Sequence, residues 1–281
     1  MKRIVYFAIA LALGVVSCSQ DLDQNPPFNY PQTGTGGGTT AMPENCILRM
    51  TFDDNLDVEG PYEMLARVNE GEEVFAEGHN GRAYQGAEGK AILLNPTVNA
   101  AGLKKLGSFT LTLWINFDGS NSSACTLFGI GHPKLSIANL ALFIEGHGKP
   151  ATNTEVFFFK GYFNGTAEKW FDMGDASKIK TGIQNKWAQI GLVYDGATST
   201  ASLYHNGTKL STNTFDKFGS LAFEEISGLV IGAFPSMVGL SSATTDWPAS
   251  GSWYTGRLDD FYLYNVAKSD TEMVKQYQDQ M

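Results

Sequence analysis

The stretch GRLDDFYLYN, residues 256–265, decides the fold of this chain. It closes the folded part of the sequence, and the part from Leu258 to Tyr264 predicts a short β-strand. Just beyond it, Ser269 is followed three residues later by Glu272, a capping-box pattern that predicts a short helix to about Tyr277. Helix signals are nearly absent before this point. The sequence therefore predicts an all-β domain that ends in one short helix.

Working outward from this stretch, other segments show the same strand periodicity. Apolar residues alternate with other residues in 108–117 and in 187–194, which is the period of a strand with one apolar face. Asn206-Gly207 lies between apolar runs and predicts a type I′ hairpin turn. Many short strands with Gly-rich turns indicate a two-sheet antiparallel sandwich or jelly roll.

Six segments, in order, resemble the laminin G-like jelly roll of the concanavalin A-like lectin/glucanase superfamily. They are 52–60, 78–84, 108–115, 187–196, 203–207 and 256–265. Two positions depart from the family pattern, Glu59 in place of Ser and Ala188 in place of His. The resemblance implies a jelly-roll sandwich whose usual work is sugar binding, but a fold alone names no ligand.

The N-terminus predicts export and lipidation. Residues 1–17 combine basic Lys2-Arg3 with an apolar run too short to span a bilayer, which is typical of a signal peptide. Val15-Val16-Ser17-Cys18 resembles a bacterial lipobox, so we expect lipid on Cys18; an ordinary signal peptide with a chance cysteine is the alternative.

The residues after the lipobox indicate where the protein is held. Ser19 argues against retention at the inner membrane, and Asp21 and Asp23 loosely resemble a surface-export signal of Bacteroidetes-type bacteria. We therefore expect a lipid-anchored outer-membrane protein at the cell surface, with periplasmic orientation left open. Residues 18–45 are rich in Pro, Gly and Thr and predict a flexible tether, which leaves 46–281 as one laminin G-like domain.

Charge and cysteine content bear on three further properties: nucleic-acid binding, disulfide formation and zinc binding. The formal net charge of −9 argues against a nucleic-acid partner. Beside Cys18, the chain has Cys46 and Cys125, which either form a disulfide or remain two separate buried thiols. Their spacing suggests no zinc site.

The sequence lacks a glycosidase pattern. Laminarinase-type enzymes of this fold carry Glu-x-Asp-x-x-Glu on one strand, which puts the carboxylates on one face, and no such motif is present. Glu224 and Glu225 are adjacent and would point opposite ways in an extended segment. No His has an acidic partner at a suggestive spacing. We expect no catalytic residues and no required cofactor.

Aromatic residues beside polar ones are the candidates for glycan binding, because sugar rings stack on Trp and Tyr. Trp247, next to Asp246, and Trp253 lie in a polar loop; Trp247 either contacts ligand or anchors that loop. On the strand 155–163, one face would be core and the other, which includes Tyr162, either a binding surface or a covered face.

Two further Trp residues complete the predicted ligand site. Trp170 follows the strand that carries Tyr162. Trp114 lies opposite the apolar face of its strand, hence on an outer sheet face where superfamily members have a concave groove; a structural role is favoured for it.

A structural calcium ion is the one metal that the resemblance implies. Asp53 and Asp260 fall where some superfamily members bind Ca²⁺ between the first and last strands, with a carbonyl from the turn 78–81. The alternative is that both carboxylates cap turns through backbone N–H groups.

The sequence thus predicts a surface-anchored, non-catalytic carbohydrate-binding lipoprotein that captures an oligo- or polysaccharide for uptake or attachment. Protein partners in a glycan-uptake complex are expected with it. A protein-binding adhesion or assembly module and a divergent glycoside hydrolase are the two alternatives.

Overall fold

A computed structural model describes residues 41–98, 101–118, 124–145, 157–164, 168–171, 178–179, 183–244 and 251–281. The chain divides into residues 1–40 and a compact unit from Ala41 to Met281. Predictions on the signal peptide, Cys18 and most of the tether lie outside the described residues, as do those on Asp246 and Trp247. Within the described ranges, no helix has both the length and the apolar character needed to cross a membrane.

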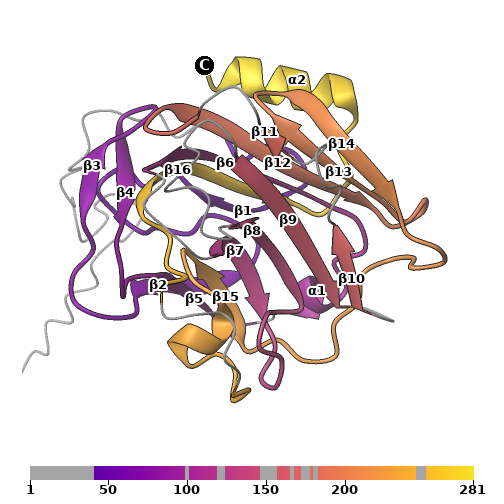
Figure 1. Ribbon diagram of the computed structural model, residues 1–281, viewed down its shortest axis with the longest axis horizontal. Coiled ribbons are helices and arrows are strands. Elements are labelled where there is room, and N and C mark those ends of the chain that lie inside the picture. Colours follow the sequence, from indigo (N-terminus) through magenta and orange to yellow (C-terminus); the bar gives the residue numbers. More distant parts are fainter. Residues whose placement is uncertain are drawn as a thin grey trace, which may run out of the picture. The chain divides into compact units, whose positions relative to one another are not determined.

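The first antiparallel sheet, sheet A, contains eight strands. Its order is β14-β13-β12-β6-β16-β4-β3, and β1 pairs with β16 beside this path (Figure 1). The strands are β1 (Cys46–Met50), β3 (Phe75–Glu77), β4 (Arg82–Gly86), β6 (Phe109–Phe117), β12 (Trp187–Asp195), β13 (Thr200–His205), β14 (Thr208–Thr214) and β16 (Gly256–Tyr264). The deciding stretch 256–265 therefore forms a strand inside sheet A.

The second antiparallel sheet, sheet B, follows the order β10-β9-β8-β7-β15-β5-β2, with β11 paired to β9. Its strands are β2 (Glu63–Val68), β5 (Ile92–Val98), β7 (Cys125–Gly131), β8 (Leu140–Glu145), β9 (Phe157–Asn164), β10 (Glu168–Phe171), β11 (Lys178–Ile179) and β15 (Gly228–Ile231). Sheets A and B form the predicted jelly-roll sandwich, so the predicted fold class is confirmed.

The core lies between the two sheets and follows from strand alternation. On β6 the residues Phe109, Leu111, Leu113, Ile115 and Phe117 are at most 1% exposed and belong to one apolar cluster. The same cluster receives alternate residues of β8 and β9 in sheet B. Burying this apolar face on both sheets is the main favourable contribution to folding.

Local sequence signals fix the turns and the helix as predicted. Asn206 and Gly207 have φ of 50° and 71°, as a type I′ turn requires. Ser269 caps α2 (Asp270–Asp279), with the reciprocal bonds of a capping box to Glu272. The described part of the chain also contains two short helical segments, α1 (Ala101–Lys104) and η2 (Pro235–Val238).

The helix α2 covers part of the outer face of sheet A (Figure 1). Met273 of α2 is fully buried with Val193 and Tyr204. The side-chain amide of Gln276 donates to the Thr112 hydroxyl at 2.6 Å. This cover decides which outward-facing residues of sheet A can meet a ligand.

The two cysteines are separate buried thiols, which is the second of the predicted alternatives. Cys46 lies with Tyr262 and Tyr264 on sheet A, whereas Cys125 lies in the core between the sheets. Burial raises the pKa of the Cys46 thiol to about 11.

Candidate ligand-binding site

Strands β9 and β10 bring two of the predicted ligand residues together. Phe159 and Phe163 point into the core, so Tyr162 faces outward, as alternation predicts. In the antiparallel pairing of these strands, Trp170 lies directly opposite Tyr162. Their ring centroids are 4.9 Å apart at an interplanar angle of 69°. We call Tyr162, Glu168 and Trp170 the β9–β10 platform.

Glu168 orients both rings of the platform. The indole N–H of Trp170 donates to one carboxylate oxygen at 2.7 Å, and the Tyr162 hydroxyl donates to the other at 3.2 Å. Burial, followed by the Glu168 charge, raises the pKa of Tyr162 well above its usual range. The phenol therefore stays protonated and keeps donating to Glu168.

Trp170 is the more exposed of the two rings of the platform. It is 39% exposed, whereas Tyr162 is 3% exposed. Phe143 on β8 meets the Trp170 ring edge at 6.2 Å between centroids. The expectation that Tyr162 itself offers a face to ligand is therefore corrected, because the neighbouring rings cover it. A ring fixed by a hydrogen bond and an edge contact, with one face in water, suits stacking on the C–H face of a sugar.

An ion pair lies farther along the outer face of sheet B. Lys160 of β9 and Glu145 of β8 are 3.0 Å apart, and both side chains are largely buried. Lys160 thus shares the outer face with Tyr162, as predicted, but its charge is matched by a carboxylate.

Trp253 is partly buried against the outer face of sheet B. It packs on a small apolar cluster formed by Ala91, Leu93, Val230 and Ala233. Residues of η2 and Leu240 pack against the same cluster. Trp253 therefore contributes to packing. Of the three predicted residues Trp170, Trp247 and Trp253, the structure describes Trp170 and Trp253, and Trp170 is the more exposed of these two.

Trp114 lies on the outer face of sheet A, as predicted, but it is only 2% exposed. His79 stacks on its ring at 3.5 Å between centroids, Tyr277 of α2 stacks at 5.6 Å, and the indole N–H donates to Gln280 at 3.3 Å. The favoured structural role of Trp114 agrees with this burial. Its candidate role as a ligand contact is corrected, because α2 covers the ring.

The structure also brings together the two predicted calcium ligands. Burial, and after it the negative charge of nearby Asp53, raises the pKa of Asp260 to about 6. Asp53 accepts the backbone N–H of Arg82 at 2.9 Å, which is the turn-capping role of the alternative interpretation. Gly81 packs so closely on Asp53 that a Cβ there would lie 2.3 Å from Oδ1.

The fit to calcium is partial. Two carboxylates and a turn carbonyl supply fewer than the six to eight oxygens that Ca²⁺ takes. Within the described ranges, no group of three or more His, Cys, Asp or Glu residues could hold a metal ion. The neighbouring Asp259, which sequence reasoning missed, accepts backbone N–H groups from His79 and Asn80.

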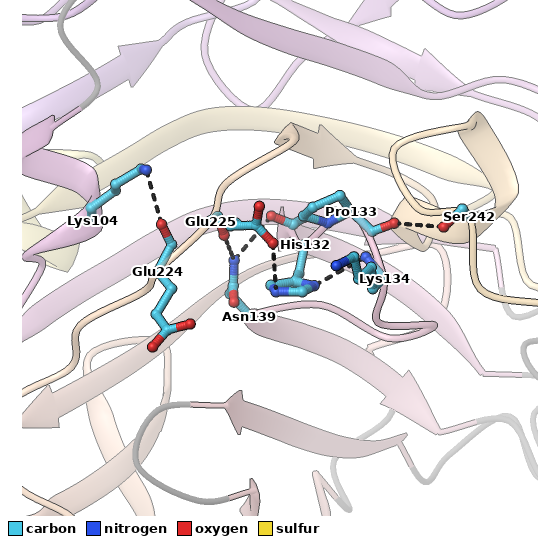
Figure 2. A network of polar contacts seen from close by, with 9 residues as sticks. Lys104, His132, Pro133, Lys134, Asn139, Glu224, Glu225 and Ser242 are labelled. Carbon is cyan, nitrogen blue, oxygen red and sulfur yellow. Dashed lines mark hydrogen bonds and ion pairs between the residues drawn. The ribbon is translucent and has the colours of Figure 1, made fainter.

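A second polar cluster lies at the end of β7 (Figure 2). His132 Nε2 is 3.7 Å from a carboxylate oxygen of Glu225, and the backbone N–H of Lys134 donates to His132 Nδ1 at 3.0 Å. Asn139 donates to the Glu225 carbonyl at 2.7 Å. Sequence spacing missed the His132–Glu225 pair because the two residues come from different loops.

This cluster holds loops together and does not form a glycosidase pair. Figure 2 shows the carboxylates of Glu224 and Glu225 directed away from each other, as the sequence predicts for an extended segment. Ser242 donates its hydroxyl to the Pro133 carbonyl at 3.0 Å rather than to His132. The two-carboxylate geometry of a glycosidase is thus not formed by this cluster.

The family assignment follows from comparison with known proteins. Residues 96–273 match the family model Laminin_G_3, described as the concanavalin A-like lectin/glucanases superfamily. The chain belongs to this family. Comparison with curated protein sequences returns no match.

Solved structures with a similar fold include binding domains of botulinum neurotoxin. The binding domain of botulinum neurotoxin DC in complex with SialylT is 14% identical, with a TM-score of 0.57 over 85% of this chain and 52% of that one. The same domain in complex with rat synaptotagmin II gives 14% identity and a TM-score of 0.57 over 84% and 52%. This chain spans about half the length of these structures, so the likeness shows the fold alone.

Proposed function

We propose that this protein is a non-catalytic carbohydrate-binding lipoprotein, held in the outer membrane by lipid on Cys18 and displayed at the cell surface. It captures an oligo- or polysaccharide for uptake or attachment. The observation that carries the proposal is the β9–β10 platform, where Glu168 fixes an exposed Trp170 on the outer face of sheet B. The membership in a lectin/glucanase superfamily supports sugar as the ligand class.

The platform would bind a sugar ring by stacking on an indole that a hydrogen bond holds in place. Covering the exposed part of Trp170 removes apolar surface from water, and Glu168 keeps the ring from turning. The contact is shallow, so we expect dissociation constants from about micromolar to about millimolar. Many copies on one cell would raise the effective affinity through avidity.

A protein-binding adhesion module is the second candidate function. The binding domain of botulinum neurotoxin DC was solved in one complex with SialylT and in another with rat synaptotagmin II, so a domain that contains a similar fold has a protein partner. An edge strand favours it here, because Leu65 on β2 is 66% exposed. The third candidate, a divergent glycoside hydrolase, has no such observation in its favour.

The test is a glycan array with the wild-type protein, followed by calorimetry on the glycans that bind. Trp170→Ala should weaken binding tenfold or more, which corresponds to about 1.4 kcal/mol. It should lower the melting temperature less than Trp114→Ala does, because Trp170 is 39% exposed and only part of its ring packs on Tyr162 and Phe143. Glu168→Gln should weaken binding less, since one of the two hydrogen bonds to the rings can still form.

Matched variants separate binding from folding. Glu224→Gln changes an equally exposed carboxylate and should leave glycan binding unchanged. A wild-type protein that binds no glycan on the array, yet retains a protein partner in pull-down, would replace this proposal by the adhesion function. Release of reducing sugar that is lost on changing one Asp or Glu would favour the hydrolase instead.

A further inference from the structure

The outer face of sheet A carries a row of four side chains beyond the end of α2. In register across neighbouring strands, Trp187 of β12 pairs with Asn116 of β6, Asn116 with Arg257 of β16, and Arg257 with Gln85 of β4. Their sequence neighbours, such as Ile115 and Leu258, belong to the core, so the row faces outward. We call these four residues the sheet A row.

Arg257 is held in place but its charge is not neutralised. Its guanidinium lies 5.3 Å from the centre of the Trp187 ring, and Nη1 donates to the Glu77 carbonyl at 2.7 Å. No carboxylate in the described part of the chain lies within ion-pair distance of it. Because the guanidinium is already held in place, it loses little conformational entropy on binding. It can therefore bind a carboxylate through two parallel hydrogen bonds.

Asn116 supplies an unused amide beneath this cation. It is 6% exposed, and its side chain hydrogen-bonds to none of the residues that the structure describes. Its amide atoms are not among the described buried polar atoms that lack a partner, so the amide reaches solvent and is open to a ligand. A ligand hydroxyl could satisfy both its donor and its acceptor.

Gln85 and Trp187 complete the row. The Gln85 amide N–H groups donate to the carbonyls of Gly86 and Gly256, both at 3.0 Å, which leaves its oxygen as an acceptor. Trp187 is partly exposed and lies 6.0 Å from the His79 ring, so a partly open aromatic ring adjoins the polar groups. The row thus combines one cation, two amides and one indole.

We propose that the sheet A row is a second ligand site, separate from the β9–β10 platform, that binds the carboxylate of an acidic sugar residue. Arg257 takes the carboxylate, Asn116 and Gln85 take neighbouring hydroxyl groups, and Trp187 covers part of the ring. An acidic peptide would satisfy Arg257, but it would not need the two amides and the indole. The formal charge of −9 on the whole chain makes an isolated, unmatched cation the local feature that an acidic ligand would seek.

The probe is a tetramer of galacturonic acid, measured by calorimetry on the full chain and compared with its methyl ester. The acid should bind and the ester should bind at least tenfold more weakly, since the ester has no charge. Arg257→Gln should weaken binding of the acid tenfold or more, and Arg257→Lys several-fold, because Lys keeps the charge and loses the planar fork. Added salt should weaken the acid and not the ester.

Controls keep this site distinct from the proposed function. Arg82→Gln removes another partly exposed arginine, one that pairs with Asp54, and should leave binding of the acid unchanged. Trp170→Ala should also leave it unchanged, so the two sites can fail independently. If Arg257→Gln perturbs folding, the shift of the Trp187 indole N–H in NMR spectra on adding the acid to wild type gives the same answer.

The site would be overturned by equal binding of acid and ester, by loss of acid binding on Trp170→Ala with none on Arg257→Gln, or by equally tight binding of a hexaglutamate peptide. Absence of an indole shift at millimolar acid would do the same.

Discussion

At the scale of single residues, Glu168 is the most informative side chain. One carboxylate accepts from both rings of the platform, so a change at this residue alters two aromatic orientations at once. The carboxylate is exposed and its hydrogen bonds contribute little to stability. Its contribution is to geometry, which is the property that a stacking site needs.

His205 makes stability depend on pH. It lies on β13, its Nε2 is buried without a hydrogen-bond partner in the described structure, and burial lowers its pKa below the usual value. The unfolded chain binds a proton near pH 6.5, whereas the folded chain resists it. The contribution of His205 to stability should therefore be fully present above about pH 6.5 and fall as the pH is lowered toward the folded pKa.

Urea unfolding at several pH values measures this dependence. His205→Gln should flatten part of the slope below about pH 6.5. His79, whose pKa burial also lowers, adds to this slope. Burial raises the pKa of Asp260 to about 6 and that of Asp259 to about 8, so these two carboxyl groups act in the opposite direction. A difference in stability between His205→Gln and the wild-type protein that stays constant as the medium is acidified through this window would contradict the assignment.

Calcium binding at Asp53 and Asp260 would stabilise the folded protein. If the ion binds the folded chain alone, calcium at 100 to 1,000 times its dissociation constant should stabilise by about 2.7 to 4.1 kcal/mol. Melting curves in chelator and in added calcium, with elemental analysis, test this. Identical curves and no bound metal would leave both carboxylates as turn caps, and Asp53→Asn serves as the matched variant.

At the scale of elements, the N-cap of α2 and its aromatic stack on Trp114 are two contacts that can be tested separately. Ser269→Ala should cost about 1 kcal/mol, the usual value for an N-cap. Trp114→Ala removes a fully covered indole between His79 and Tyr277 and should cost about 3–5 kcal/mol. Urea midpoints measure both. Trp170→Ala is the control, and a Trp114 effect no larger than that of Trp170 would argue against the cover.

The elements also show what could be predicted from the sequence. The capping box at Ser269, the positive φ pair Asn206-Gly207 and the alternation in 108–117 depend on neighbouring residues, and the structure confirms them. Alternation also placed Trp114 on the correct face. It could not show that α2, more than 150 residues later in the chain, covers that face.

The candidate sites were less predictable, because they depend on contacts between residues that are far apart in the sequence. Tyr162 and Trp170 were selected by residue type, but their pairing depends on the register between β9 and β10. The sheet A row draws one side chain from each of four strands that are far apart in sequence, so no spacing rule could find it. The His132–Glu225 contact was missed on the same ground.

At the scale of the whole molecule, the anchor is the testable expectation. Cys18→Ala removes the thiol that takes the lipid, so the variant should appear in the soluble fraction of cells instead of the membrane fraction. Fractionation and mass spectrometry of the mature N-terminus measure this. The matched control is Cys46→Ala, which changes a buried thiol of the domain and should stay with membranes. A Cys18 variant that remains in the membrane fraction would rule out lipidation there.

The position of β16 within sheet A has a consequence for when the domain can fold. This strand comes last along the chain, yet it pairs with β6, β4 and β1, which come from the first half. Until β16 has been synthesised, those three strands lack their common partner, and the contacts that join them span most of the domain. Such long-range pairing slows folding. Because β16 must be synthesised before the sandwich can close, the proposed export would act on a chain whose domain has not yet folded.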